Sequence, residues 1–131
     1  MEPMTEQAAA TPIATFDLTV LDTPDPRGLA QFYCALLGWE VAQDGDDWVT
    51  VRPPGGGPGL AFQLAPDHVP PTWPDNAVPQ QSHLDLTVPD LDRGEQQVVA
   101  LGARVTGQPE QPSGFRAFLD PAGHPFCLCL P

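Results

Sequence analysis

The chain has 131 residues, 41% of them apolar, and a net charge of −12 from seventeen acidic residues against five arginines and no lysine. Nucleic acids and anionic membranes bind basic surfaces, so this composition argues against both partners. No apolar run reaches the roughly 18 residues that span a bilayer, and three cysteines make no disulfide framework, so we expect reduced thiols in a cytoplasmic protein.

The chain divides into a tail and one domain. Residues 1–12 are predicted to be a flexible tail, because they are acidic and lack the basic and apolar parts of a secretory signal. Residues 13–131 suit a single domain in length. Within it we expect a first module at 13–65, a linker at 66–81 whose prolines oppose regular structure, and a second module at 82–131.

The first module is predicted to start with a strand at 14–20, where "ATFDLTV" alternates polar and apolar residues. A helix should follow between Asp25, a suitable cap, and Gly38, a suitable end. The segments "WEVAQ", "WVTVRP" and "GLAFQLA" are strand candidates. The core face of the first strand is predicted to carry Phe16, Leu18 and Val20, and the opposite face Thr15, Asp17 and Thr19.

The second module repeats this order. The strand "SHLDLTV" at 82–88 echoes "ATFDLTV", and a helix follows between Asp90 or Asp92 and Gly102. The last strands are predicted in "ARVTG", "FRAFL" and "PFCLCL". Strand, helix and three strands, stated twice, predict an α+β fold in which two tandem βαβββ modules form a curved mixed sheet around a ligand trough.

Three stretches resemble a known superfamily: "FDLTVLDTPDPRGLAQFYCALLGWEV", "HLDLTVPDLDRGEQQVVALGARV" and "FLDPAGHPFCLCL". They are similar to the vicinal oxygen chelate proteins, which include glyoxalase I, bleomycin-resistance proteins and extradiol dioxygenases, and look closest to the glyoxalase-like branch. The resemblance implies paired modules around a ligand cavity and a homodimer, but not one reaction, since the fold hosts several chemistries. Arginine without lysine, among abundant Ala, Gly and Pro, is typical of a high-GC bacterial genome.

The resemblance also implies positions for metal ligands. Metal-using relatives take His and Glu from the first and last strands of each module, and these positions correspond here to Thr15, Gln63, His83 and Cys127. Only His83 is a first-choice ligand, and both carboxylates are missing. We therefore expect no metal cofactor, while a divalent Zn, Ni, Mn or Fe held by His83, Gln63 and Cys127 stays open. His83 is alternatively a hydrogen-bonded cavity histidine or a catalytic base.

The ligand-binding candidates are acids and aromatic residues predicted to face the trough. Asp17 and Asp85 need partners such as Arg52 or Arg116, or else meet a cationic ligand, because a buried unpaired carboxylate is unfavourable. Aromatic walls suit a planar or cationic guest. The full set of candidates is Asp17, Asp85, Trp48, Arg52 and Phe115.

The C-terminal stretch "DPAGHPFCLCL" gathers a histidine and two cysteines. We expect His124 to be an exposed part of a turn and Cys127 to be an inert buried thiol. Cys127 and Cys129 share a strand face with their Cα atoms about 6.5–7 Å apart, which disfavours a disulfide between them.

Two functions are compatible with these residues. The first is a metal-independent small-molecule binding protein of the glyoxalase and bleomycin-resistance type, which holds an amphipathic or cationic ligand in the trough. The second is a metal-dependent lyase, isomerase or dioxygenase of the same superfamily. A metal-free enzyme with His83 as base is a third possibility, although no nucleophile accompanies it in the sequence.

Overall fold

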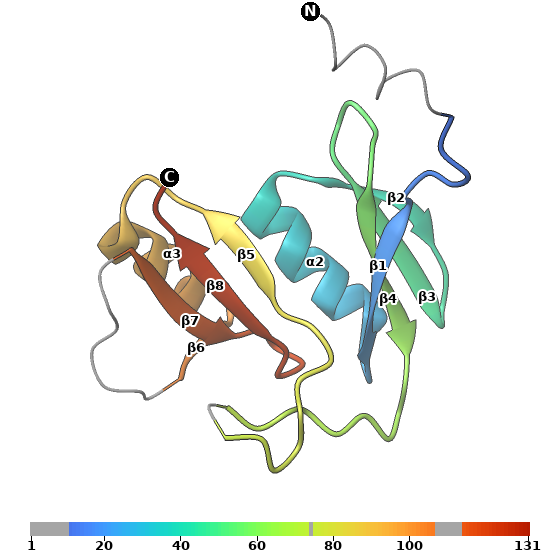
Figure 1. Ribbon diagram of the computed structural model, residues 1–131. Helices are drawn as coiled ribbons and strands as arrows, with labels where there is room; N and C mark the ends of the chain where they lie inside the picture. Colours follow the sequence, from blue (N-terminus) through green and yellow to red (C-terminus); the bar gives the residue numbers. More distant parts are fainter. Residues whose placement is uncertain (1–10, 74, 107–113) are drawn as a thin grey trace, which may run out of the picture.

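The computed structural model describes residues 11–73, 75–106 and 114–131, and contains two four-stranded sheets and two helices (Figure 1). The first sheet has the order β1-β4-β3-β2 and the second β5-β8-β7-β6. In each sheet one pair is parallel and the others antiparallel. The strands are β1 (Leu18–Thr23), β2 (Glu40–Asp44), β3 (Trp48–Arg52), β4 (Gly59–Leu64), β5 (Leu84–Thr87), β6 (Arg104–Val105), β7 (Phe115–Leu119) and β8 (Pro125–Cys129). The helices are α2 (Pro26–Leu37) and α3 (Leu91–Leu101).

This architecture confirms the predicted α+β fold of two strand–helix–three-strand modules. Within the described ranges no strand pairing joins the two sheets, so the sheet is not closed around a trough. The predicted N-terminal tail falls largely on residues 1–10, which lie outside the described residues. Neither described helix has the length and apolar character needed to cross a bilayer.

Local chemistry explains where both helices begin and end. The Asp25 carboxylate accepts a hydrogen bond from the Gly28 amide at 3.1 Å, and the Asp90 carboxylate accepts one from the Arg93 amide at 2.9 Å. Each cap satisfies an N–H that has no partner inside the helix. Gly38 ends α2 at a φ of 70°, a left-handed conformation that glycine adopts without strain. Asp90, rather than Asp92, is therefore the cap of the second helix.

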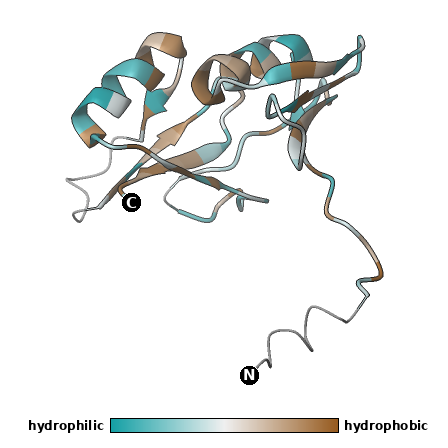
Figure 2. Ribbon diagram, turned by 90° about the horizontal axis from the view of Figure 1, so that it is seen from above, coloured by the Kyte–Doolittle hydropathy of each residue, from teal (hydrophilic) through white to brown (hydrophobic). Residues whose placement is uncertain are grey.

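Both helices lie on the same side of the two sheets (Figure 2). They cover one apolar core to which both modules contribute, and the rings of Phe32 on α2 and Phe126 on β8 are 6.0 Å apart. The largest fully buried side chains of this core are Tyr33, Phe62, Phe118, Phe126, Leu29 and Leu128. We call the opposite side of the sheets, which no helix covers, the open face.

The first strand presents its faces differently from the prediction. Leu21 lies in the core beside its β4 partner Phe62, whereas Phe16 is 63% exposed and Val20 40% exposed. The strand begins at Leu18, so the echo between 14–20 and 82–88 aligns residues that are not structural counterparts. The correct alignment of the two modules matches their helix caps, and it is shifted by three residues from the alignment of the two alternating stretches. Because neighbouring side chains of a strand point to opposite faces, a shift by an odd number of residues exchanges the two faces.

A buried carboxylate ties the first helix to the second module. Asp120, which is fully buried, precedes β8, and its Oδ2 accepts a hydrogen bond from the Tyr33 hydroxyl at 2.7 Å. Its Oδ1 accepts from the amides of Ala122 at 2.9 Å and His124 at 3.0 Å. The "DPAGHP" turn is therefore organised from within by its first residue.

Burial, with the charge of Asp120, raises the pKa of Tyr33 well above its ordinary value. Above about pH 10 the unfolded chain then loses a phenolic proton that the folded protein retains, so stability is expected to fall as pH rises. Because Tyr33 is the single tyrosine, its phenolate absorbance reports this titration directly. Urea unfolding across this range should show a weaker pH dependence in Tyr33→Phe, and an equal dependence in both proteins would contradict this account.

Candidate functional site

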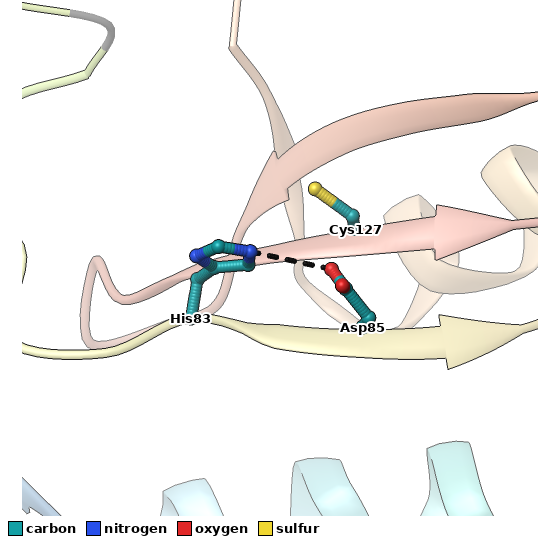
Figure 3. Close-up of side chains that lie close together, drawn as sticks. All are labelled: His83, Asp85 and Cys127. Atoms are coloured by element: carbon teal, nitrogen blue, oxygen red, sulfur yellow. Dashed lines mark ion pairs between the residues drawn. The ribbon is translucent and has the colours of Figure 1, made fainter.

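Three side chains that could serve as metal ligands meet on the open face of the second sheet (Figure 3). His83 and Asp85 project from the start of β5, and their Nε2 and Oδ1 atoms are 3.3 Å apart. Cys127 is the register partner of Asp85 on β8, so its side chain points to the same face. One donor atom from each residue lies within 4.8 Å of the others. We call these residues the open-face cluster.

The members of the cluster differ in their access to solvent. The side chains of His83 and Asp85 are 39% and 64% exposed, whereas Cys127 is buried between the strands. Burial raises the pKa of the Cys127 thiol to about 11, and the negative charge of Asp85 adds to this effect. The same two causes raise the pKa of Cys129. Cys127 is buried, as expected, and its raised pKa keeps it a protonated thiol near neutral pH, the form in which a cysteine reacts slowly.

This pKa predicts slow alkylation of Cys127. At about pH 8, iodoacetamide should modify Cys127 in the folded protein about a hundredfold more slowly than in the urea-unfolded chain, since the thiolate is the reactive form and a pKa of about 11 leaves little of it. Asp85→Asn should accelerate the reaction severalfold because it removes the nearby negative charge. Mass spectrometry of the peptide that contains Cys127 measures both rates. The half-buried Cys34 in the same sample is an internal control that Asp85→Asn should leave unchanged.

The candidates of the first module form a separate group. Asp17 precedes β1 and forms an ion pair with Arg52, with Nη2 and Oδ1 2.7 Å apart, so its charge is already balanced. The Trp48 indole donates to the Thr50 hydroxyl at 2.8 Å, on the side of β3 opposite the buried Val49. Gln63 on β4 is the register partner of Trp48.

Matching the helix caps shows which residues are counterparts in the two modules. His83 precedes the Asp90 cap by seven residues, and Leu18 precedes the Asp25 cap by the same number. Thr15, the predicted counterpart of His83, lies before β1 and outside the strand. The same spacing makes Leu18 the counterpart of His83, and Val20 the counterpart of Asp85. Because Asp85 pairs with Cys127 and Val20 pairs with Ala61, the counterpart of Cys127 is Ala61. At these three positions the open face is therefore polar in the second module and apolar in the first.

Phe115 and Arg116, neighbours on β7, point to opposite sides of the second sheet. Phe115 pairs in register with Cys129, on the open face, and is half-buried. Arg116 faces the helix side, where it binds Asp92 and Glu95 at 2.8 and 3.1 Å. Asp85 therefore has His83, rather than Arg116, as its charged neighbour.

His124 departs from the prediction of an exposed turn residue. It is 8% exposed, and its Nε2–H donates to the backbone carbonyl of Asp22 at 2.6 Å. Its ring also lies 4.8 Å from that of His68 in the linker. Neither this histidine pair nor the buried Asp120 was among the predicted site residues. Their burial depends on contacts between distant segments. The one local signal in the sequence is the "DP" that opens the turn, since an aspartate at this place commonly accepts hydrogen bonds from amides of its own turn.

The chain is similar to a known domain family and to several solved structures. The model of the glyoxalase-like domain matches residues 18–129. The genomically encoded fosfomycin resistance protein of Listeria monocytogenes is 16% identical, with a TM-score of 0.68 over 92% of this chain and 95% of that one. The bleomycin-binding protein of Streptomyces verticillus, solved with copper(II)-bleomycin, is 20% identical, with a TM-score of 0.58 over 92% of this chain and 99% of that one.

A glyoxalase/bleomycin resistance protein/dioxygenase family enzyme of Burkholderia phytofirmans is 16% identical, with a TM-score of 0.67 over 89% of this chain and 98% of that one. No curated protein matches the chain. At these identities the structural likeness supports a shared fold and no particular reaction.

Proposed function

Because the chain belongs to the glyoxalase-like domain family of the vicinal oxygen chelate superfamily, we propose that it is a small-molecule binding protein that works without a metal. Its ligand is amphipathic or cationic and lies on the open face between the modules. The chemical asymmetry of this face carries the proposal. Leu18 and Val20 offer apolar contact, and the fully buried Ala61 adds no polar group, where the second module offers the open-face cluster.

The charge distribution favours a cation at the polar end of this face. Asp17 is balanced by Arg52, whereas the carboxylate of Asp85 is 64% exposed and, in the described chain, has as its ion-pair partner only His83, which is charged only when protonated. A ligand cation beside Asp85 gains an ion pair without breaking an internal one. Phe115 on the same face supplies an aromatic surface for a planar or cationic group.

Calorimetric titration with copper-free bleomycin and with ethidium, a planar cation, tests the proposal. Binding of either probe should weaken up to about fivefold in Asp85→Asn, since an exposed charge pair contributes up to about 1 kcal/mol. Phe115→Ala should also weaken it. Asp17→Asn is the matched control and should retain wild-type affinity, because Asp17 already pairs with Arg52. No binding of either cation, or equal losses in Asp85→Asn and Asp17→Asn, would count against this site.

The second candidate function is a metal-dependent lyase, isomerase or dioxygenase, and the open-face cluster is the observation that favours it. Imidazole, carboxylate and thiolate are all zinc ligands, and three protein ligands leave a position for water or substrate. The set fits zinc better than a hard cation such as Mn²⁺, because a thiolate is a soft ligand. In this case His83, Asp85 and Cys127 would hold the ion, which would supply Lewis acidity. The Cys127 thiol would first have to lose its proton.

Metal analysis of protein prepared without a histidine tag separates the two functions. Stoichiometric zinc that disappears in both His83→Ala and Cys127→Ser would support the metal-dependent function. Gln63→Ala is the matched control, because Gln63 lies on the other sheet and is not needed by the cluster. A preparation that contains no metal and takes up none of Zn, Ni, Mn or Fe would leave the metal-independent binding protein.

We also propose a cytoplasmic homodimer. Strands β1 and β5 each form one edge of their sheets, opposite the edges formed by β2 and β6, and an edge strand pairs readily with a second chain. Sedimentation equilibrium measures the mass in solution, and a monomer at all accessible concentrations would contradict the dimer.

A further inference from the structure

A groove of about 710 Å³ lies between the end of β1, the linker and the turn that joins β7 to β8. In Figure 1 this linker is the yellow-green segment that runs from β4 to β5. None of the predicted site residues, and no member of the open-face cluster, lines the groove. Its volume is in the range of small-molecule sites, which is roughly 300–1,000 Å³.

The walls of the groove carry apolar side chains that the protein leaves in contact with solvent. Val20 on β1 is 40% exposed, and Val69 in the linker is 65% exposed. Val78, near the other end of the linker, lines the same groove and is half-buried. Apolar surface gathered in one concave place, rather than scattered singly, marks a binding site for an apolar group.

Two carboxylates line the groove, and its other ionisable lining residues in the described chain are His68 and His124. The exposed Asp22 and Asp67 both line it, and within the described part of the chain neither forms an ion pair. No arginine is among the described lining residues, and the chain has no lysine. His124 donates its Nε2–H to the Asp22 carbonyl, which leaves the Asp22 carboxylate for another partner. An anionic ligand would meet repulsion here, whereas a cation would meet two carboxylates.

The linker contains buried polar atoms that the packing of the described chain does not satisfy. Three of its buried polar atoms have no hydrogen-bond partner among the described residues, namely His68 Nε2, Trp73 Nε1 and Gln80 Oε1. Unpartnered buried polar groups weaken the packing that buries them. The linker is nonetheless held in place over the turn, where a Cβ added to Gly123 would approach the Pro70 Cβ to 2.5 Å. One wall of the groove is therefore positioned but weakly fixed.

We infer that this groove is a second ligand site, distinct from the open-face cluster, which binds the ammonium group of an alkylamine between Asp22 and Asp67 and its alkyl chain against Val20, Val69 and Val78. The site requires an amine with a short apolar chain. It shares Val20 with the apolar part of the open face but no residue with the open-face cluster, so substitutions of Asp22 and Asp67 test the groove without touching the polar residues of the proposed function.

Methyl NMR titration of the full chain with n-hexylamine, 1-hexanol and hexanoate tests this site. Hexylammonium should shift the methyl signals of Val20, Val69 and Val78, and should bind about tenfold more tightly than hexanoate, as expected for contacts with two partly exposed carboxylates. The double variant Asp22→Asn with Asp67→Asn should lose this preference for the amine, while the affinity for hexanol stays unchanged.

A charge-matched pair of variants separates the groove from the general acidity of the protein. Val69→Arg places a cation in the groove and should weaken hexylammonium binding about tenfold. Val41→Arg makes the same charge change at a 49% exposed position on β2, the opposite edge of the first sheet, and should leave the affinity within about twofold.

Three outcomes would overturn the inference. Equal or tighter binding of hexanoate would contradict the ligand class. Equal losses in Val69→Arg and Val41→Arg would show attraction to net charge alone. Shifts confined to β5 and β8, or no shift with any of the three probes, would show that the groove is not the site.

Discussion

Asp120→Ala is expected to lower the free energy of unfolding by about 3 kcal/mol or more, the largest effect of any single polar substitution that we predict. The fully buried carboxylate accepts hydrogen bonds from the Tyr33 hydroxyl and from the amides of Ala122 and His124. Its removal leaves three donors unpartnered, and each such group costs about 1–3 kcal/mol when it stays buried. The loss also separates α2 from the turn before β8.

Urea unfolding followed by tryptophan fluorescence measures this change. Asp46→Ala is the control, because Asp46 is 95% exposed in its ion pair with Arg27. Its replacement should change the free energy of unfolding by no more than about 0.5 kcal/mol. Tyr33→Phe should give an intermediate loss, since it removes one of the three donors and leaves the other two in place. A stable Asp120→Ala protein would mean that water replaces the carboxylate in the turn.

Phe126→Ala is expected to destabilise the protein by about 3–5 kcal/mol, the range found when a large aromatic side chain is removed from a core. Phe126 is fully buried on β8, and its ring lies 6.0 Å from that of Phe32 and 5.6 Å from that of Phe118. Because Phe32 belongs to the first module and Phe118 to the second, the resulting cavity would open at the shared core. The two modules should still unfold in one transition, at a lower denaturant concentration.

Phe16→Ala is the matched control for this loss. Phe16 is 63% exposed, although its place in an alternating stretch predicts a core residue, and its replacement should change the free energy of unfolding by no more than about 0.5 kcal/mol. Chemical denaturation of the two variants side by side compares a buried and an exposed phenylalanine in one chain. Equal losses would contradict the face that the structure assigns to the start of the first strand.

The distribution of polar groups on the open face bears on both proposed functions. Metal-using relatives were expected to place one ligand pair in each module, but here His83, Asp85 and Cys127 all belong to the second. Their counterparts in the first module are apolar, so a metal would have to be held from one side only. This one-sided arrangement is the main reason to prefer a binding protein over a metal-dependent enzyme.

The site was predictable only in part. Strand alternation placed His83 and Asp85 on one face, because the apolar residues between and after them in β5 face the core. The position of Cys127 beside them was implied only by the family resemblance, and the pairing of β5 with β8 puts it on that face. The contact of Asp85 with Cys127, rather than with an arginine, depends on the register between two strands some forty residues apart in the sequence. Local pattern carries no information on that register.

The sequence by itself determined the order of the elements, since the caps Asp25 and Asp90, the terminating Gly38 and the alternation of strands act over a few residues. Only the tertiary structure decided which face of the first strand is buried, because pairing with β4 turns Leu21, and not Val20, toward the helices. It also buried His124 against Asp22, more than a hundred residues away in the chain. Packing between distant segments has no counterpart in local sequence pattern, and for this reason the fold was predicted more fully than the site.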